Sequence, residues 1–118
     1  MDTMQKRYRK ATNEIRKNGV KFHTNVRACC RSCITEEQLG IQEGDTNYGY
    51  TYGGQGSAVS ISGNKAYYQS DKSPAEEIYI NYGSLDAGRI IQDAFVKNGF
   101  NVEWDGDGRS CIIITFAA

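Results

Sequence analysis

The last third of the chain carries two hydrophobic periodicities in succession, and this pattern restricts the fold more than any other feature. Apolar residues alternate over 78–82, which predicts a strand. Ser84 can cap a helix with apolar residues at helical spacing, and Gly99 is placed to end it. Alternation returns over 100–104, and 111–116 is apolar on both faces, as in a strand inside a sheet. This β-α-β-β succession predicts an α+β fold.

The rest of the chain predicts one further long helix and several strands. Residues 3–17 carry a narrow apolar stripe at helical spacing, and Asn18-Gly19 follows as a stop signal. A short helix is predicted over 35–39, with Thr35 as its N-cap. The remaining predicted strands cover 20–28, 47–54 and 65–69.

Residues 56–62 fit a strand or a short helix about equally well, and the sequence leaves this choice open. Gly63-Asn64 predicts a hairpin turn that leads into the next strand. The chain has no internal repeat and no linker. We therefore expect a single α+β domain over 1–118, with a mixed or antiparallel sheet and two main helices.

Composition excludes several classes of protein. A hydrophobic content of 39%, with 11% aromatic residues, is too high for a disordered chain. No apolar run approaches the roughly 20 residues of a membrane span. Residues 1–10 are charged and lack the apolar core of a signal peptide. We therefore expect no membrane partner and a cytoplasmic location. In that compartment cysteines are more often thiols or metal ligands than disulfides.

Charge is distributed unevenly along a chain whose net charge is zero. Residues 1–33 hold nine Lys or Arg against two acids, a balance of +7, and the remaining residues offset it. The basic N-terminal helix, 1–18, could face nucleic acid or the acidic part of its own fold. One short basic run is weak evidence for nucleic-acid binding. A solvated helix neutralised by the rest of the domain is the favoured interpretation, and nucleic acid is not the expected partner.

The motif Cys29-Cys30-x-x-Cys33 is the sharpest local feature of the chain. Two thiols separated by two residues can chelate zinc, and Cys111 or His23 would have to complete the four ligands. The same spacing suits a redox pair of Cys30 and Cys33. Cysteines are also often buried as small apolar residues. The sequence leaves these three interpretations open, with zinc as the candidate cofactor.

Tyrosines and glycines alternate in the middle of the chain. Tyr48, Tyr50 and Tyr52 fall on one face of the predicted strand, and Gly49 and Gly53 leave the other face bare. Aromatic rings beside open backbone suit a planar or nucleotide-like ligand, although tyrosines are also ordinary strand residues. We predict a concave site with a ring stacked on the ligand. Its further candidate contacts are Tyr79, Asn81 and Arg89.

Catalytic patterns are weak throughout the sequence. The one histidine, His23, would have to serve any Cys-His or Ser-His dyad. The glycine-rich run 49–56 lacks the lysine of a P-loop. Asp105 and Asp107 alternate with glycines. This pattern favours a hairpin turn over a cation site. An enzyme is therefore the less expected class.

Three segments together resemble an uncharacterised family of small bacterial proteins. They are the Cys-Cys-x-x-Cys segment 25–33, the strand Ile-Tyr-Ile-Asn-Tyr-Gly at 78–83, and the motif Gly-Phe-Asn-Val-Glu-Trp-Asp-Gly at 99–106. The resemblance covers residues 25–115 and implies an α+β domain with a cysteine-rich segment. It implies no activity.

Three functions remain as hypotheses. The leading one is a non-enzymatic module that binds a small molecule or nucleotide, as do small proteins that sequester a signalling nucleotide in phage counter-defence. The first alternative is a protein-interaction domain that is stabilised by a zinc ion bound to cysteines. The second is a cysteine-based redox enzyme. A homo-oligomer is a further expectation, because the bare strand face could abut a second subunit.

Overall fold

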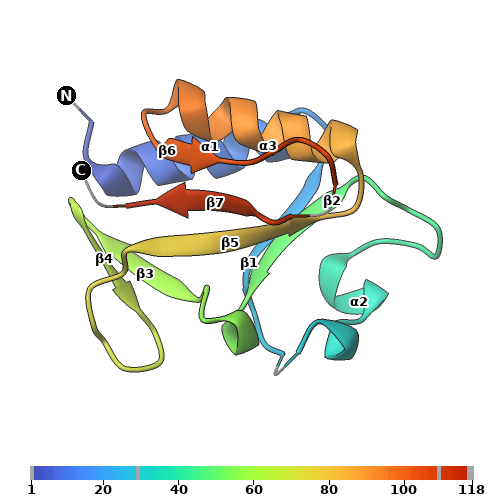
Figure 1. The fold of residues 1–118 in the computed structure, drawn as a ribbon, viewed down its shortest axis with the longest axis horizontal. Coiled ribbons are helices and arrows are strands. Elements are labelled where there is room, and N and C mark those ends of the chain that lie inside the picture. Colours follow the sequence, from blue (N-terminus) through green and yellow to red (C-terminus); the bar gives the residue numbers. More distant parts are fainter. Residues whose placement is uncertain (1, 29, 109, 117–118) are drawn as a thin grey trace.

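The computed structural model describes residues 2–28, 30–108 and 110–116. Two long helices and a five-stranded sheet form most of the molecule (Figure 1). The elements in chain order are α1 (Met4–Lys17), β1 (Lys21–Val26), η1 (Arg31–Cys33), α2 (Glu36–Leu39), β2 (Tyr48–Tyr52), η2 (Gly53–Gln55), β3 (Val59–Ser62), β4 (Lys65–Tyr68), β5 (Glu77–Tyr82), α3 (Leu85–Lys97), β6 (Asn101–Glu103) and β7 (Ile112–Thr115).

The main sheet is mixed, which confirms the predicted α+β class. Its strand order is β1-β2-β5-β7-β6, with β1 and β2 parallel and the other neighbours antiparallel. Strand β7 lies between β5 and β6, because its side chains are apolar on both faces and a central position covers both. The shortest strand, β6, forms one edge.

Helices α1 and α3 lie side by side and cover one face of this sheet, which we call the helix face (Figure 1). Thr3 and Ser84 cap them as N-cap residues, each accepting a backbone N–H of the first turn. Lys97 of α3 pairs with Glu14 of α1 at 2.9 Å. No helix among the described residues is long and apolar enough to cross a membrane.

The hydrophobic core lies between the two helices and the helix face of the sheet. Ile15, Ile91 and Phe95 from the helices are fully buried there. The sheet contributes alternate residues that point the same way: Phe22, Ile78, Ile80, Ile112 and Ile114. Burying one such side chain stabilises the fold by about 1.5–3 kcal/mol, so this layer supplies most of the driving force.

The predicted bare face of β2 at Gly49 is wrong. Gly49 lies on the helix face, and a Cβ atom there would come within 2.5 Å of Ile91 Cδ1 and 3.1 Å of Phe22 Cδ1. The glycine is covered by the protein's own core. Its missing side chain is what lets α3 approach the sheet closely at this point.

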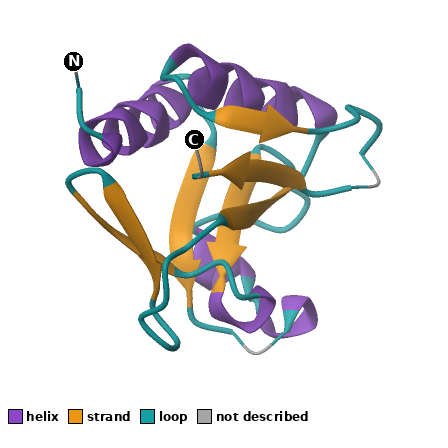
Figure 2. Cartoon of the chain, turned by 60° about the vertical axis from the view of Figure 1, so that its left-hand side comes forward, coloured by secondary structure: helices purple, strands orange, loops and turns teal. Residues whose placement is uncertain are grey.

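The β3–β4 hairpin stands apart from the main sheet as a second, two-stranded sheet (Figure 2). The choice left open for 56–62 is therefore settled as a strand, preceded by the short helix η2. Hydrogen bonds of Tyr68 in the hairpin and of Ser57 just before it connect this region to β5. Tyr79 N donates to Ser57 Oγ at 3.0 Å, and the Tyr68 hydroxyl donates to the Glu77 carbonyl at 3.1 Å.

Candidate functional site

The three tyrosines of β2 lie on the face of the sheet that points away from the helices, which we call the tyrosine face. Their rings form a row, with centroids 6.1 Å apart for Tyr48 and Tyr50 and 6.0 Å apart for Tyr50 and Tyr52. Such spacing is that of interacting aromatic pairs. The alternation read from the sequence therefore places these rings together as expected.

The described residues of the segment 27–46 cover this tyrosine row. Tyr50 and Tyr52 are only 4% and 8% exposed and pack with Val26 and Leu39 in a second, smaller core. Helix α2 is fixed over them by a capping box between Thr35 and Gln38, and by the bond of 2.7 Å between His23 Nε2 and the Leu39 carbonyl. The two rings contact protein and leave little surface for a ligand to stack on.

The other predicted contacts divide between the two faces of the sheet. Asn81 lies opposite Tyr50 in the strand register and is buried, and Tyr79 shares its face. The Tyr79 hydroxyl donates to Glu77 Oε1 at 3.0 Å, and this bond raises the pKa of Tyr79. Arg89 is exposed on α3, 3.7 Å from Asp86, and α3 covers the helix face. The structure therefore brings Asn81 and Tyr79 to the tyrosines but not Arg89.

The predicted metal ligands are only partly described. Cys29 lies outside the described residues. Cys30 and Cys33 approach each other on η1, with their Sγ atoms 3.1 Å apart. Cys111 lies beside Asn81 on the tyrosine face, 3.4 Å from its Oδ1. No group of three or more His, Cys, Asp or Glu side chains within 2–28, 30–108 and 110–116 could hold a metal ion, and the zinc site stays a prediction.

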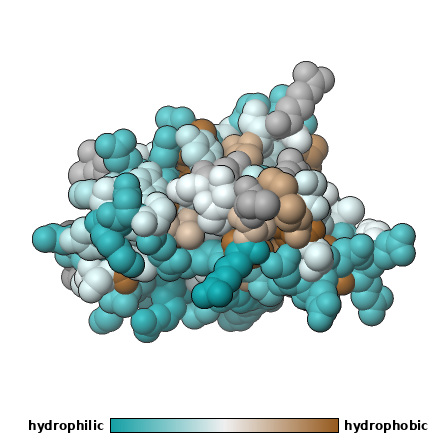
Figure 3. Space-filling view, turned by 90° about the horizontal axis from the view of Figure 1, so that it is seen from below, coloured by the Kyte–Doolittle hydropathy of each residue, from teal (hydrophilic) through white to brown (hydrophobic). Residues whose placement is uncertain are grey.

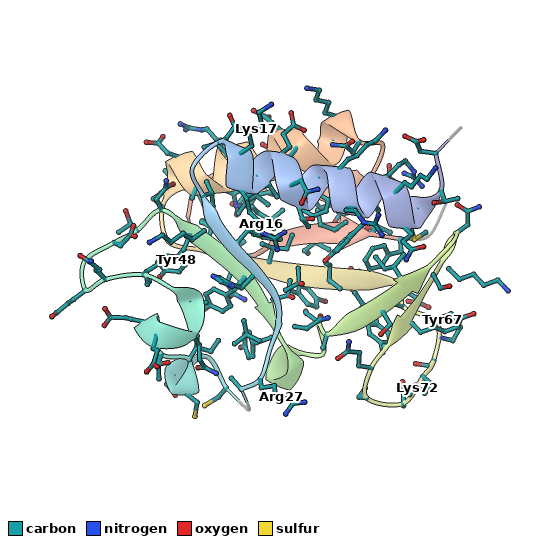
Figure 4. The ribbon with its side chains drawn as sticks, turned by 180° about the vertical axis from the view of Figure 1, so that it is seen from behind. Arg16, Lys17, Arg27, Tyr48, Tyr67 and Lys72 are labelled. Carbon is teal, nitrogen blue, oxygen red and sulfur yellow. The ribbon has the colours of Figure 1, made fainter. Side chains whose placement is uncertain are left out.

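A pocket of about 270 Å³ lies where the parallel strands β1 and β2 end. Four chain segments form it: the end of β1, residues 53–56, the start of β3 and the end of β4. We call 53–56 the glycine turn and this hollow the glycine-turn pocket. Figure 4 shows Arg27 at the end of β1 farthest from α1. The residues that line the pocket include Asn25, Arg27, Gly53, Gly56, Gln69 and Ser70.

Glycines keep one wall of this pocket open. A Cβ atom at Gly53 or at Gly56 would meet no other atom within 4 Å. Gly56 also has φ +72°, a left-handed conformation that glycine adopts without strain. Gly54 N donates to the Ala28 carbonyl at 2.8 Å, which ties the glycine turn to the chain after β1. The turn therefore brings bare backbone to the rim of the pocket.

Arg27 gives the pocket its charge. Among the described residues it is the one charged residue that lines the pocket, and no carboxylate lines it with Arg27. The Arg27 side chain is exposed, and within the described part of the chain its guanidinium makes no ion pair or hydrogen bond. Gln69 Nε2 donates to Ser60 Oγ at 3.3 Å, which holds the amide at the pocket's edge. The pocket can therefore accept an anionic group.

Sequence reasoning missed Arg27, Gln69 and Ser70 as site residues. The glycine-rich run 49–56 was the one signal in the sequence that pointed to this region. Nothing local marks an arginine after a strand as different from other surface arginines. Seen from below, most of the molecular surface is hydrophilic, with an apolar area near its middle (Figure 3).

Comparison with known proteins gives no identification. No protein-family profile matches the chain, and neither a curated protein nor a solved structure matches it. The resemblance to a family of small bacterial proteins stays a prediction. The fold defines an α+β protein, and the glycine-turn pocket is its candidate binding site.

Proposed function

We propose that the protein is a non-enzymatic module that binds a small anionic molecule, with a nucleotide as the leading candidate, in the glycine-turn pocket. One observation carries the proposal: Arg27 lines a pocket beside open glycine backbone, and none of the other described residues that line it is a carboxylate. A guanidinium pairs with a phosphate through two parallel hydrogen bonds, which makes arginine a common phosphate ligand.

The size and lining of the pocket support a small polar ligand. Ligand pockets usually measure about 300–1,000 Å³, and this one, at 270 Å³, lies just below that range. It suits a ligand no larger than a mononucleotide. Gln69 Nε2 donates to the Val59 carbonyl and to Ser60 Oγ, so its amide oxygen and the Ser70 hydroxyl are the polar groups offered to fix the orientation of sugar or base groups.

The role of the histidine favours binding over histidine-dependent catalysis. The one histidine, His23, has its Nε2 on the Leu39 carbonyl at 2.7 Å, which is a structural role. We further propose that the protein sequesters a signalling nucleotide by holding it in this pocket.

Calorimetric titration with inorganic phosphate and with adenosine and guanosine monophosphates tests the proposal. Arg27→Gln should weaken binding at least about tenfold, because a hydrogen bond to a charged group is worth about 1.5–3 kcal/mol. Lys17→Gln is the matched control, since it removes an exposed cation on α1, away from the pocket (Figure 4). Equal affinities for the two variants, or no binding by the wild-type protein, would contradict the proposal.

Gly53→Phe gives a second, independent variant. Because a Cβ at Gly53 meets no atom within 4 Å, the substitution should leave the fold intact while its ring reduces the space in the pocket. We expect the variant to keep the unfolding temperature of the wild-type protein and to lose ligand binding.

A further inference from the structure

Cys30 and Cys33 form a pair of thiols on the surface and are not among the described residues that line the glycine-turn pocket. Both residues are exposed, and their Sγ atoms lie 3.1 Å apart. The Cys33 backbone N–H donates to the Cys30 carbonyl at 3.1 Å, so one turn of η1 holds the two side chains on the same side. A disulfide needs its sulfurs about 2.05 Å apart, and a movement of about 1 Å closes the difference.

We propose that Cys30 and Cys33 form a reversible intramolecular disulfide through exchange with a low-molecular-weight disulfide such as glutathione disulfide. A cysteine thiolate attacks one sulfur of glutathione disulfide, a mixed disulfide forms, and one glutathione thiolate leaves. The second cysteine thiolate then attacks the protein sulfur of the mixed disulfide and releases the second glutathione thiolate. The protein loses two electrons and two protons, and glutathione disulfide is reduced to two molecules of glutathione.

The geometry assigns the first attack to Cys30. The Ser32 hydroxyl lies 3.2 Å from Cys30 Sγ and can donate a hydrogen bond to its thiolate. The thiolate is the nucleophile, so a donor beside one sulfur favours that sulfur as the attacking group. Cys33 then acts as the resolving thiol. Ser32 is a positioning residue in this scheme and touches no substrate.

Zinc fits the same pair less well. Two thiolates on a tetrahedral zinc, each about 2.3 Å from the metal, lie about 3.8 Å apart. The observed 3.1 Å differs from that spacing by about 0.7 Å, so the distance alone does not separate zinc from a disulfide. Zinc also needs two more ligands, and the described residues offer no cluster of three or more metal-binding side chains.

The experiment incubates the reduced full-length protein with glutathione disulfide, blocks remaining thiols with iodoacetamide and measures the intact mass. We expect loss of two hydrogen atoms, with two thiols protected from alkylation, and full reversal by dithiothreitol. Cys29→Ser and Cys111→Ser, the matched controls, should behave like the wild-type protein. Cys30→Ser should lose the intramolecular disulfide, and Cys33→Ser should instead accumulate one bound glutathione on Cys30.

Three outcomes would overturn the proposal. One is a disulfide that survives Cys30→Ser and disappears in Cys29→Ser. Another is a wild-type protein that collects only mixed disulfides with glutathione. The third is stoichiometric zinc in the purified protein that protects the thiols until a chelator removes it. Ser32→Ala should slow formation of the mixed disulfide in the Cys33→Ser background, a readout that a purely structural serine would not change.

None of these results depends on the glycine-turn pocket, so failure of one proposal leaves the other standing.

Discussion

The side-chain amide of Asn25 pairs with the backbone of Val59 as one strand pairs with another. Asn25 Nδ2 donates to the Val59 carbonyl, and Val59 N donates to Asn25 Oδ1, both at 3.1 Å. Asn25 itself has φ +60°, a left-handed conformation at the irregularity in β1. This pair connects β1 to the β3–β4 hairpin, and Asn25 also lines the glycine-turn pocket. The shape of the pocket depends on it.

Removing the Asn25 amide should destabilise the protein. Asn25→Gly keeps the left-handed backbone and loses both bonds, and it should lower the free energy of unfolding by about 1–3 kcal/mol. Asn25→Ala should cost about 1 kcal/mol more, since alanine disfavours a positive φ. Urea unfolding measures both. Equal stability of the wild type and Asn25→Gly would show that the Val59 bonds contribute nothing.

Gly49→Ala should destabilise the fold through overpacking by about 1–3 kcal/mol, because its Cβ would lie 2.5 Å from Ile91 Cδ1. Ile91→Val removes that Cδ1 atom. The double variant should therefore lose less stability than the sum of the two single variants. Strictly additive losses in urea unfolding would contradict the close approach of α3 to β2.

Tyr50 and Tyr79 should respond very differently to truncation. Tyr50 is 4% exposed in the second core, and Tyr50→Ala should lower the free energy of unfolding by about 3–5 kcal/mol, as for other buried aromatics. Tyr79 is half-buried, and Tyr79→Ala should cost about 1 kcal/mol. Chemical unfolding of the two variants tests this. A harmless Tyr50→Ala would mean that the segment 27–46 leaves the tyrosine row open to a ligand.

The loop after β6 should show a pH dependence that comes from Asp105. Its carboxylate accepts hydrogen bonds from Asp107 N at 3.1 Å and from Ser110 Oγ at 2.9 Å, and these bonds lower the pKa of Asp105. Because the folded-state pKa is lowered, the stabilisation is present above the unfolded value of about 3.9 and is lost as pH falls through the folded value.

Titration of the Asp105 carboxyl by NMR measures this effect. Ser110→Ala should raise the Asp105 pKa toward the ordinary value, because one of the two bonds to the carboxylate is gone. Asp105 titrating at or above the ordinary value in the wild-type protein would contradict the hydrogen-bonded turn.

The parts of the fold that depend on local sequence could be predicted. The caps Ser84 and Thr35 begin α3 and α2 as expected, and Gly99 ends α3 with φ +85°. The row of three tyrosines follows from alternation alone. These features depend on residues within a few positions of one another, and their periodicity is visible in the chain.

Contacts between distant segments could not be predicted. Gly49 gives no local sign that Ile91, more than forty positions later, will pack on it. The segment that covers Tyr50 contains only the two short helices η1 and α2. Their sequence pattern does not indicate which face of the sheet they cover. The pocket combines Arg27 with Gly53 and Gln69, which only the tertiary fold brings together.

The most direct test of the central claim is an NMR titration of the labelled wild-type protein with adenosine monophosphate, followed through the backbone amides. We expect saturable shifts at Arg27, Gly53, Gly56, Gln69 and Ser70, which line the glycine-turn pocket, and small shifts on α1 and α3. Arg27→Gln should remove these shifts, and Lys17→Gln should keep them. Shifts confined to the basic helix α1, or no saturable shift with any nucleoside monophosphate or with phosphate, would contradict the account.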